Sequence, residues 1–349
     1  MVLGYPGTSI PQPNEPAVKE PQDMIRKAFS AVLLLMLTVL TGCMSVDISG
    51  LMGHELEEIT LREPSRLFVS DRVAVLDIAG VISTHAPPLF GSATCTPDGV
   101  RAVLKKLEQD PRVKALVLRI NSPGGGVTAT DMMHHEIRRF KEKTAIPVIA
   151  VFMDVACSGG YYLATAADAI YAHPTTITGS IGVIATFPKW QGLAGKIGYE
   201  QVVVKSGEMK DIGNPMREMS AGERKVFQDM IDDMYGRFLT TVVEGRRRYA
   251  TPAELRPVAD GRIYTAQQAL ELGLIDGICH LDQALDKALE AAGIRDARVI
   301  AYVTKDVGDP TIYSTLDARL VPGKLLNVDL PGVGQGSTPG FHYLWMPGE

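Results

Sequence analysis

Apolar runs of strand length alternate with helix-like segments through the middle of the chain. Residues 147–153 are wholly apolar and residues 114–120 are apolar apart from Lys114 and Arg119, which is typical of strands buried on both faces of a parallel sheet. Each run ends in a Gly-rich loop that leads into a helical pattern. This order predicts an α/β fold in which both loops lie at the carboxyl edge of one sheet, where such folds place their chemistry.

The rest of the periodicity predicts a scaffold around that sheet. The expected elements are a first strand at 72–82, a helix at 98–108, a strand at 200–204, a long helix at 220–247 and a further helix at 265–272 that Gly273 ends. In the long helix the apolar residues Val226, Met230, Met234 and Phe238 follow i, i+4 spacing, and Thr251 to Glu254 has the pattern of a capping box with Pro252 at the first helical position.

The two Gly-rich loops contain the parts of an acyl-transfer site. Residues 120–126 read INSPGGG and residues 156–160 read ACSGG. Three successive glycines let a backbone approach a substrate with its N–H groups free, and a tight strand-to-helix turn would present Ser158 as a nucleophile. Gly-rich turns are common in α/β proteins and Ser is an ordinary turn residue. Two such loops on successive strands favour the catalytic interpretation.

A serine nucleophile needs a base, which is most often His. None of the seven His residues of this chain has a supporting context. The segment KSGEMKDI at 205–212 offers Lys210 instead. A lysine base must have a pKa about three units below its usual value of about 10.4, which requires desolvation. For Lys210 taken alone, a solvated surface charge is the ordinary alternative.

Five ordered motifs resemble one protein family. They are NSPGGG from Asn121, ACSGGYYLA from Ala156, TITGSIGV from Thr176, KSGEMKD from Lys205 and ADGRIYTAQQA from Ala259. Through them residues 73–303 resemble the signal peptide peptidase (protease IV) family of serine proteases in its short, single-repeat form. The resemblance implies the α/β fold of crotonases and Clp proteases, with a parallel sheet and flanking helices.

The resemblance also implies roles for single residues. Ser158 corresponds to the nucleophile and Lys210 to the general base of a Ser/Lys dyad. The N–H groups of Gly125 and Gly159 correspond to the oxyanion donors, and Ser180 to a hydroxyl that orients the lysine amine, although a Ser in a Gly turn is usually structural. Related proteases with a Ser/His/Asp triad carry a His where this chain has Val183, which argues against a triad.

The N-terminal region predicts export. Residues 24–43 combine a basic start at Met24, a short apolar core and the ending LTGC, the pattern of a secretory signal. The ending resembles a bacterial lipobox, which implies that Cys43 is lipidated. The apolar core is shorter than the roughly 20 residues of a membrane span, but an extended signal anchor is the alternative. Residues 1–23 are Pro-rich and expected to be disordered, so Met24 is a candidate start.

Composition narrows the function classes. The 349 residues are 46% hydrophobic and 21% charged, enough for one domain of roughly 250 residues. With a net charge of -5 and no basic cluster larger than residues 246–248, nucleic acid is not an expected partner. Besides Cys43, Cys95, Cys157 and Cys279 show no C-x-x-C spacing. We expect no metal and no cofactor, and we expect Cys157 to pack inward.

These observations predict a membrane-anchored serine endopeptidase of the bacterial cell envelope, with its protease domain on the periplasmic side. The expected organisation is a disordered extension (1–23), a lipoprotein-type signal peptide (24–43), a linker (44–70), the protease domain (71–303) and a Pro/Gly-rich tail (304–349) that ends in the apolar run 341–346. By the resemblance, its substrates are residual signal peptides or other membrane-derived or unfolded peptides. The resemblance further implies a homo-oligomeric ring with active sites shared between subunits, and together with the apolar run 341–346 it indicates a contact between chains at the tail. A catalytically silent scaffold and a crotonase-type acyl-CoA enzyme are the alternatives, and the lipobox argues against the latter because CoA is cytosolic.

Overall fold

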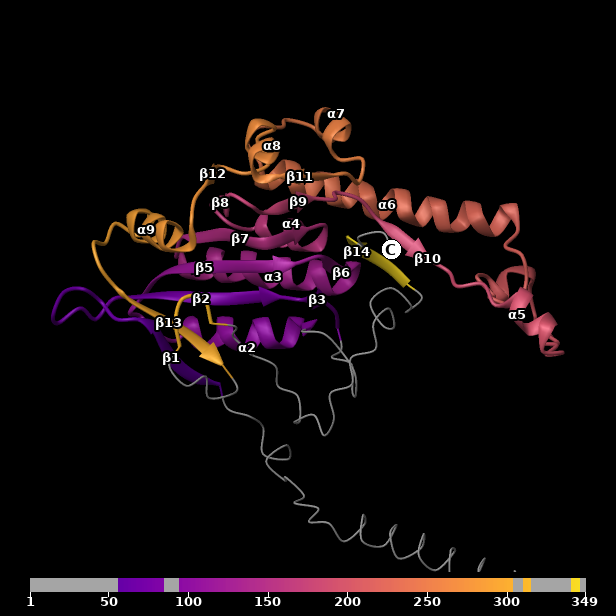
Figure 1. The fold of residues 1–349 in the computed structure, drawn as a ribbon, viewed down its shortest axis with the longest axis horizontal. Coiled ribbons are helices and arrows are strands. Elements are labelled where there is room, and N and C mark those ends of the chain that lie inside the picture. Colours follow the sequence, from indigo (N-terminus) through magenta and orange to yellow (C-terminus); the bar gives the residue numbers. More distant parts are fainter. Residues whose placement is uncertain (1–55, 85–93, 304–309, 315–339, 346–349) are drawn as a thin grey trace, which may run out of the picture. The chain divides into compact units, whose positions relative to one another are not determined.

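One large sheet and one small sheet organise the chain (Figure 1). The computed structural model describes residues 56–84, 94–303, 310–314 and 340–345. The large sheet has the order β1-β13-β2-β5-β7-β8-β12, with β9 paired to β7 and β11 to β9. Its strands are β1 (Glu57–Arg62), β2 (Arg72–Ala79), β5 (Val113–Ser122), β7 (Val148–Cys157), β8 (Ala169–Ala172), β9 (Ile177–Gly179), β11 (Ile263–Thr265), β12 (Gly277–Ile278) and β13 (Arg298–Val303).

The central strands of the large sheet are parallel and buried on both faces. Pairings β13–β2, β2–β5, β5–β7 and β7–β8 are all parallel. Alternate residues of each strand enter different apolar clusters, as Leu116 and Leu118 do on one face and Ala115 and Val117 on the other. This two-sided burial explains why residues 114–120 and 147–153 show no polar alternation.

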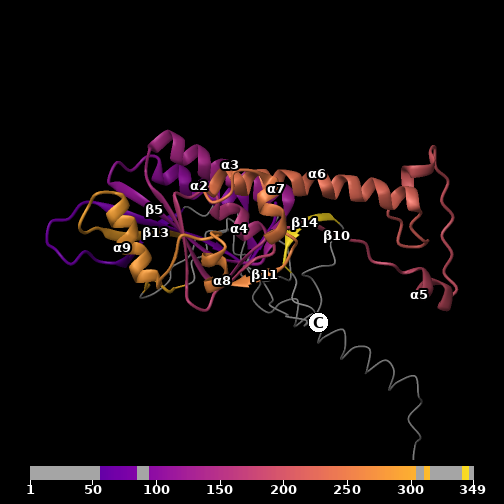
Figure 2. The ribbon, with the colours of Figure 1, turned by 90° about the horizontal axis from the view of Figure 1, so that it is seen from above.

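Helices cover both faces of this sheet (Figure 2). Helices α2 and α3 pack with the cluster of one face, and α9 packs with the cluster of the other. The described helices are α2 (Pro97–Leu107), α3 (Val127–Thr144), α4 (Gly159–Ala164), α5 (Gln191–Lys196), α6 (Ala221–Gly245), α7 (Pro252–Leu255), α8 (Ala266–Glu271) and α9 (Leu281–Ala291), with 3-10 turns η2 (Glu208–Asp211) and η3 (Arg256–Val258).

The small sheet gathers short strands around the first Gly-rich loop. Its order is β10-β14-β6-β3-β4, and its strands are β3 (Val81–Ile82), β4 (Thr94–Cys95), β6 (Gly124–Gly126), β10 (Ile184–Thr186) and β14 (Gly340–Leu344). Strand β6 is the GGG of the loop. The C-terminal strand β14 lies between β6 and β10, so the predicted tail contributes to the fold of its own chain.

The structure confirms the α/β class with a mostly parallel sheet and most of the predicted elements. The predicted first strand is interrupted at Gly80, which has a φ of 76° and separates β2 from β3. Strand β1, within the predicted linker 44–70, pairs with β13. At α7 only half of the capping box forms, because the Glu254 carboxylate accepts from the Ala250 N–H rather than from its N-cap residue Thr251.

Two predictions for the region 200–247 were wrong in part. Residues 200–204 form no strand, because the described chain offers them no neighbouring strand, and Val202 and Val204 are 87% and 95% exposed. The long helix α6 forms behind a complete capping box at Ser220. Of its apolar stripe, however, Phe238 is buried, whereas Val226 and Met230 are 41% and 40% exposed.

The N-terminal predictions lie outside the described residues. Residues 1–23, the signal segment 24–43 and Cys43 all precede residue 56. In the part of the chain that the structure describes, no helix combines the length and the apolar character that crossing a membrane requires.

Candidate active site

Ser158 occupies a sharp turn between β7 and α4. Its φ of 51° and ψ of -113° are a backbone conformation that L-residues seldom adopt. The turn is held from both sides, because the Ser158 N–H donates to the Gly179 carbonyl at 2.8 Å and the Ser158 carbonyl accepts from the Tyr162 N–H at 2.9 Å. Such strain persists only where the surroundings impose it, and it concentrates at functional sites. A sharp strand-to-helix turn of this kind is the arrangement that nucleophile elbows use.

The Ser158 hydroxyl is buried without a partner. The residue is 1% exposed, and its Oγ makes no hydrogen bond within the described part of the chain. A buried polar atom left unpaired costs about 1–3 kcal/mol. Buried side-chain polar atoms are nearly always hydrogen-bonded, and the exceptions include groups that act in catalysis or sit in strained backbone.

The first Gly-rich loop lies directly against this turn. A Cβ on Gly124 would lie 2.7 Å from the Gly159 nitrogen, and a Cβ on Gly125 would lie 1.9 Å from the Ile82 carbonyl oxygen. Gly124 also has a φ of 100°. The structure therefore brings Gly124, Gly125, Ser158 and Gly159 together at the carboxyl ends of β5 and β7, and side chains are excluded from the loop by backbone on both sides.

Strand β14 runs alongside the Gly-rich loop. It pairs antiparallel with β6, placing Tyr343 opposite Gly125, and the Trp345 N–H donates to the Pro123 carbonyl at 2.8 Å. The Tyr343 carbonyl oxygen would lie 3.1 Å from a Cβ on Gly159 and 2.0 Å from one on Gly124. A backbone carbonyl thus occupies the space between the two glycine loops.

The Tyr343 side chain fills an apolar pocket beside the nucleophile helix. It is fully buried, its ring stacks on Tyr162 with centroids 5.3 Å apart, and Phe238 lies 4.7 Å away. Its hydroxyl donates to the Met234 carbonyl of α6 at 2.9 Å. Sequence analysis missed Tyr343 as part of the site. The available signal was the apolar run 341–346, which was assigned to a contact between chains.

Ser180 lies next to the nucleophile turn. It follows Gly179, whose carbonyl holds Ser158, and its own N–H donates to the Arg262 carbonyl at 2.7 Å. Ser180 also has a φ of 51° and is 8% exposed. Of the four described non-glycine residues with positive φ, two are therefore at this site. The backbone of Ser180 thus lies beside the Ser158 turn, and the orienting role of its hydroxyl stays a prediction.

Lys210 lies apart from these residues within one chain. It is exposed on η2, and its neighbour Met209 contacts Gly222 at the start of α6. The nucleophile region instead contacts the far half of α6, where the Thr241 hydroxyl donates to the Tyr162 hydroxyl. Gly222 and Thr241 are about 28 Å apart along the helix at 1.5 Å per residue. One lysine side chain cannot bridge that separation.

Figure 1 shows the same arrangement at the level of the elements. Helix α6 leads from the neighbourhood of α4 and β14 to α5. The segment 187–222, here called the arm, includes α5 and η2. Within the described residues, the Lys210 side chain makes no hydrogen bond and no ion pair.

The described His residues do not supply a base to Ser158. His134 is the buried one nearest to α4, and it lies 3.2 Å from the Thr165 hydroxyl and edge-on to Tyr162. Burial lowers the pKa of His134 to about 4. His173 and His280 contact each other at 2.9 Å. Because the Ser158 Oγ has no described partner, none of these rings is bonded to it.

Cys157 packs inward, as the sequence predicted. It is fully buried and burial raises the pKa of its thiol to about 12. It is therefore a neutral packing residue at neutral pH. In the described ranges no three His, Cys, Asp or Glu residues are grouped as metal ligands are.

Comparison with known proteins identifies the family. Residues 140–295 match the family model described as peptidase family S49, and residues 94–178 match that of Clp protease. A signal peptide peptidase SppA homologue of Enterococcus faecium is 35% identical to this chain over 272 residues. The aligned residues cover 78% of this chain and 76% of that protein. The chain belongs to peptidase family S49.

Two further relatives are longer than this S49 chain. Protease 4 of Salmonella typhi is 33% identical over 59% of the chain and 32% of its own length. The chloroplastic serine protease SPPA of Arabidopsis thaliana is 34% identical over 64% of the chain and 33% of its own length. The S49 match supports a serine peptidase, and the Clp protease match agrees with the observed fold.

Proposed function

We propose that this S49 serine peptidase hydrolyses peptide bonds with Ser158 as nucleophile and Lys210 as general base. The observation that carries the proposal is the buried, unpartnered Oγ of Ser158 in a strained turn beside Gly124 and Gly159. Neutral Lys210 takes the Ser158 proton as Oγ attacks the scissile carbonyl, and the N–H groups of Gly125 and Gly159 stabilise the oxyanion. The amine then leaves with that proton, and a water activated by Lys210 hydrolyses the acyl ester.

The two halves of the dyad come from neighbouring subunits. The separation along α6 rules out their meeting in one chain by side-chain motion alone, and Lys210 faces solvent on the arm. The arm also carries exposed apolar side chains, which favour a protein contact. Eight large apolar residues of the described arm are exposed: Trp190, Leu193, Ile197, Tyr199, Val202, Val203, Val204 and Met209. Val226 and Met230 of α6 continue them.

A second copy of this chain is the partner that such an arm requires. The nucleophile region presents a buried serine without a base, and the arm presents a lysine without a nucleophile. A heterologous, repeating contact between copies supplies each serine with the lysine of the next subunit, and it closes into a ring if the rotation allows. The homo-oligomer expected from the family resemblance has this form.

The substrate binds as an extended strand against β6. Strand β14 already pairs with Gly124–Gly126 and sets its Tyr343 carbonyl between the glycine loops. A peptide in the same register would place its scissile carbonyl beside Gly159 and a large side chain in the pocket of Tyr162 and Phe238. Strand addition of this kind gives affinity through the backbone. It requires that β14 leave the groove.

The proposed setting is the periplasmic side of a bacterial membrane, with Cys43 as lipid anchor and residual signal peptides or other membrane-derived or unfolded peptides as substrates. The support is the signal-like segment 24–43 and the names of the relatives. Palmitate labelling of the protein expressed from Met24 tests the anchor. Label that survives Cys43→Ala, or an intact Met24 on the membrane-bound protein, would favour a signal anchor instead.

A fluorophosphonate probe tests the chemistry most simply. The wild-type oligomer is expected to label at Ser158, whereas Ser158→Ala and Lys210→Ala are expected not to label. Labelling of Lys210→Ala at the wild-type rate would remove Lys210 from the mechanism. A wild-type protein that neither labels nor cleaves peptides would favour the catalytically silent scaffold.

A further inference from the structure

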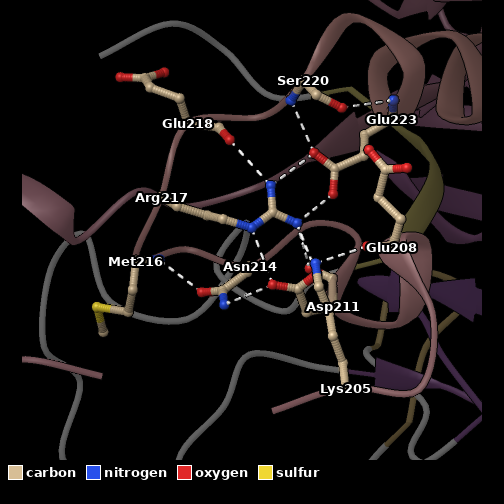
Figure 3. Close-up of polar contacts among 9 residues, drawn as sticks. All are labelled: Lys205, Glu208, Asp211, Asn214, Met216, Arg217, Glu218, Ser220 and Glu223. Carbon is tan, nitrogen blue, oxygen red and sulfur yellow. Dashed lines mark hydrogen bonds and ion pairs between the residues drawn. The ribbon is translucent and has the colours of Figure 1, made fainter. Parts of the chain in front are cut away.

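A single arginine connects the lysine-bearing turn to the long helix (Figure 3). The Arg217 Nε donates to Asp211 Oδ2 at 3.0 Å, and its Nη2 donates to Asp211 Oδ1 at 2.9 Å and to the Asp211 carbonyl at 3.1 Å. Its Nη1 donates to Glu223 Oε2 at 2.8 Å, and Nη2 also bonds Glu223 Oε1. This bidentate contact on two carboxylates uses every nitrogen of the guanidinium.

The two carboxylates belong to the turn that carries Lys210 and to the first turn of α6. Asp211 directly follows Lys210 and is the last residue of η2. Glu223 is 2% exposed and belongs to the capping box of α6, where its carboxylate accepts from the Ser220 N–H at 2.8 Å. Arg217 thereby fixes the turn of Lys210 to the start of the helix that leads back to the nucleophile region.

The other hydrogen bonds of the turn come from its immediate neighbours in sequence. The Lys210 N–H donates to the Gly207 carbonyl at 3.1 Å and the Asn214 N–H to the Asp211 carbonyl at 3.1 Å, and Lys205 Nζ donates to the Glu208 carbonyl at 2.7 Å. A short 3-10 turn of this kind is easily deformed. Within the described residues, Arg217 is the side chain whose hydrogen bonds join this turn to α6, so the position of Lys210 relative to the helix depends on the Arg217 contacts.

The same cluster also occupies the carboxylate next to Lys210. Lys205 Nζ lies 2.5 Å from Asp211 Oδ1, so Asp211 is held by two cations. The hydrogen bonds from Arg217 and then Lys205 hold the pKa of Asp211 well below its usual range, and Arg217 lowers the pKa of Glu223 to about 2. Both carboxylates therefore stay ionised and occupied at every pH at which the enzyme would work.

We propose that Arg217 is a positioning residue for catalysis: it fixes the Lys210 turn on α6 and keeps the Asp211 carboxylate from pairing with the Lys210 amine. The inference rests on the proposed role of Lys210. A carboxylate that pairs with a lysine stabilises the protonated form. An Asp211 that lost Arg217 and kept only Lys205 and Asn214 as partners would be freer to pair with Lys210 and so to hinder a base that must be neutral. The charged groups around the turn are Lys205, Glu208, Asp211, Arg217, Glu218 and Glu223.

The test compares pH profiles of kcat/KM for variants of the full-length oligomer on a fluorogenic peptide. For Arg217→Gln, the midpoint of the rising part, or limb, of the profile is expected to shift to a higher pH by about one unit, since a nearby opposite charge typically shifts a pKa by one to three units. Activity should fall about tenfold at pH 7.5 and recover toward pH 10. Arg224, exposed in the first turn of α6 next to Glu223, gives the matched control Arg224→Gln, for which the profile is expected to be unchanged.

Two further variants separate positioning from folding. Asp211→Asn in the Arg217→Gln background removes the released carboxylate, so the limb should return toward the wild-type pH. Arg217→Lys keeps one positive charge without the fork, and its limb should lie between those of the wild type and Arg217→Gln. Both variants are assayed only after a native mass measurement confirms that they form the oligomer.

The inference is wrong if Arg217→Gln loses activity by the same factor at every pH, if Arg224→Gln shifts equally, or if the double variant leaves the limb displaced. If Arg217→Gln does not assemble, Arg217→Lys provides the test. A pH profile of kcat/KM for Arg217→Lys that superimposes on that of the wild type would contradict the proposed role of Arg217. Lys210→Ala distinguishes this failure from that of the proposed function. If Lys210→Ala is inactive while the limb of Arg217→Gln is unmoved, only the inference fails; if Lys210→Ala is active, the dyad fails as well.

Discussion

The nucleophile region and the arm carry the two proposed catalytic residues in opposite environments. Around Ser158 the backbone is held by strands β7 and β9, and neighbouring glycines leave no space for a side chain. Around Lys210 the chain is exposed, lacks strand pairing and depends on an ion-pair cluster. The serine is thus placed by the core of its own chain, whereas the lysine is placed on a surface.

This difference shows what one chain can complete by itself. A strained nucleophile turn needs a rigid sheet to impose it, and the single chain provides that. A lysine base needs desolvation, and the exposed η2 of a single chain does not provide it. In our proposal the contact with a second subunit both brings Lys210 to Ser158 and removes water from it. Assembly would then act as the activating step.

The largest expected effect is that of Ser158→Ala. We expect kcat to fall by at least about 10⁴-fold, because the covalent step is lost. Thermal unfolding should occur at a temperature no lower than that of the wild type, since the variant removes a buried hydroxyl that has no partner. Calorimetry and peptide hydrolysis on the same preparation measure both. A clear loss of stability would mean that this hydroxyl is a structural group.

Lys210→Ala should reduce kcat by about 100-fold or more, the usual cost of losing a general base. Its stability should be unchanged, since within the described chain this exposed side chain makes no hydrogen bond and no ion pair. Lys196→Ala is the matched control for the arm, because Lys196 is exposed on α5 of the same segment. Retention of more than about a tenth of the wild-type rate by Lys210→Ala would contradict the dyad.

Gly124→Ala tests the close approach of the two loops. Its Cβ would lie 2.0 Å from the Tyr343 carbonyl oxygen and 2.7 Å from the Gly159 nitrogen, and the φ of 100° is unfavourable for alanine. We expect kcat/KM to fall by about 100-fold, comparable to the loss of one oxyanion donor. Gly192→Ala, on α5 where a Cβ meets nothing within 4 Å, should leave activity unaltered. Equal effects of the two variants would refute the assigned geometry.

Removal of β14 should raise activity. Deletion of residues 340–349 opens the strand position beside β6. If β14 occupies this position about nine-tenths of the time, its removal should raise kcat/KM by up to about tenfold. Deletion of only residues 346–349 keeps the strand and is the control. A truncated enzyme that folds but has lost activity would show that β14 supports the site instead of blocking it.

The smallest expected effect concerns His134 in the nucleophile region. Its pKa is lowered to about 4 in the folded chain, against about 6.5 when unfolded. The unfolded state therefore binds more protons between these values, so stability falls as the pH falls from about 6.5 to 4, by up to about 3 kcal/mol. His134→Gln should flatten this dependence in urea unfolding. An unchanged slope would mean that other groups cause it.

The sequence predicted the nucleophile region better than the arm for a physical reason. Runs 114–120 and 147–153 are buried on both faces, and their loops follow from Gly and Ser at fixed offsets. These are local signals. The position of Lys210 depends on the length of α6 and on the Arg217 contacts with Asp211 and Glu223, residues six positions away on either side. No periodicity reports such contacts.

The same limit applies to the elements that sequence analysis misplaced. The run 200–204 has strand composition, but a strand needs a neighbour, and the described chain provides none. Val226 and Met230 continue the apolar stripe of α6 beyond the part that packs on its own chain. The tail strand β14 was expected to contact another chain, yet Tyr343 is buried beside Tyr162 of its own chain. Composition indicated burial in each case without indicating the partner.

Mixing two inactive variants tests the central claim most directly. Ser158→Ala and Lys210→Ala chains, each without activity alone, are combined in equal amounts under conditions of subunit exchange, and native mass spectrometry confirms mixed oligomers. If each site takes its serine and its lysine from neighbouring subunits, about a quarter of the sites should recover. Hydrolysis near that fraction of the wild-type rate is the predicted result. Mixed oligomers that remain inactive would contradict the shared site and place both residues within one subunit.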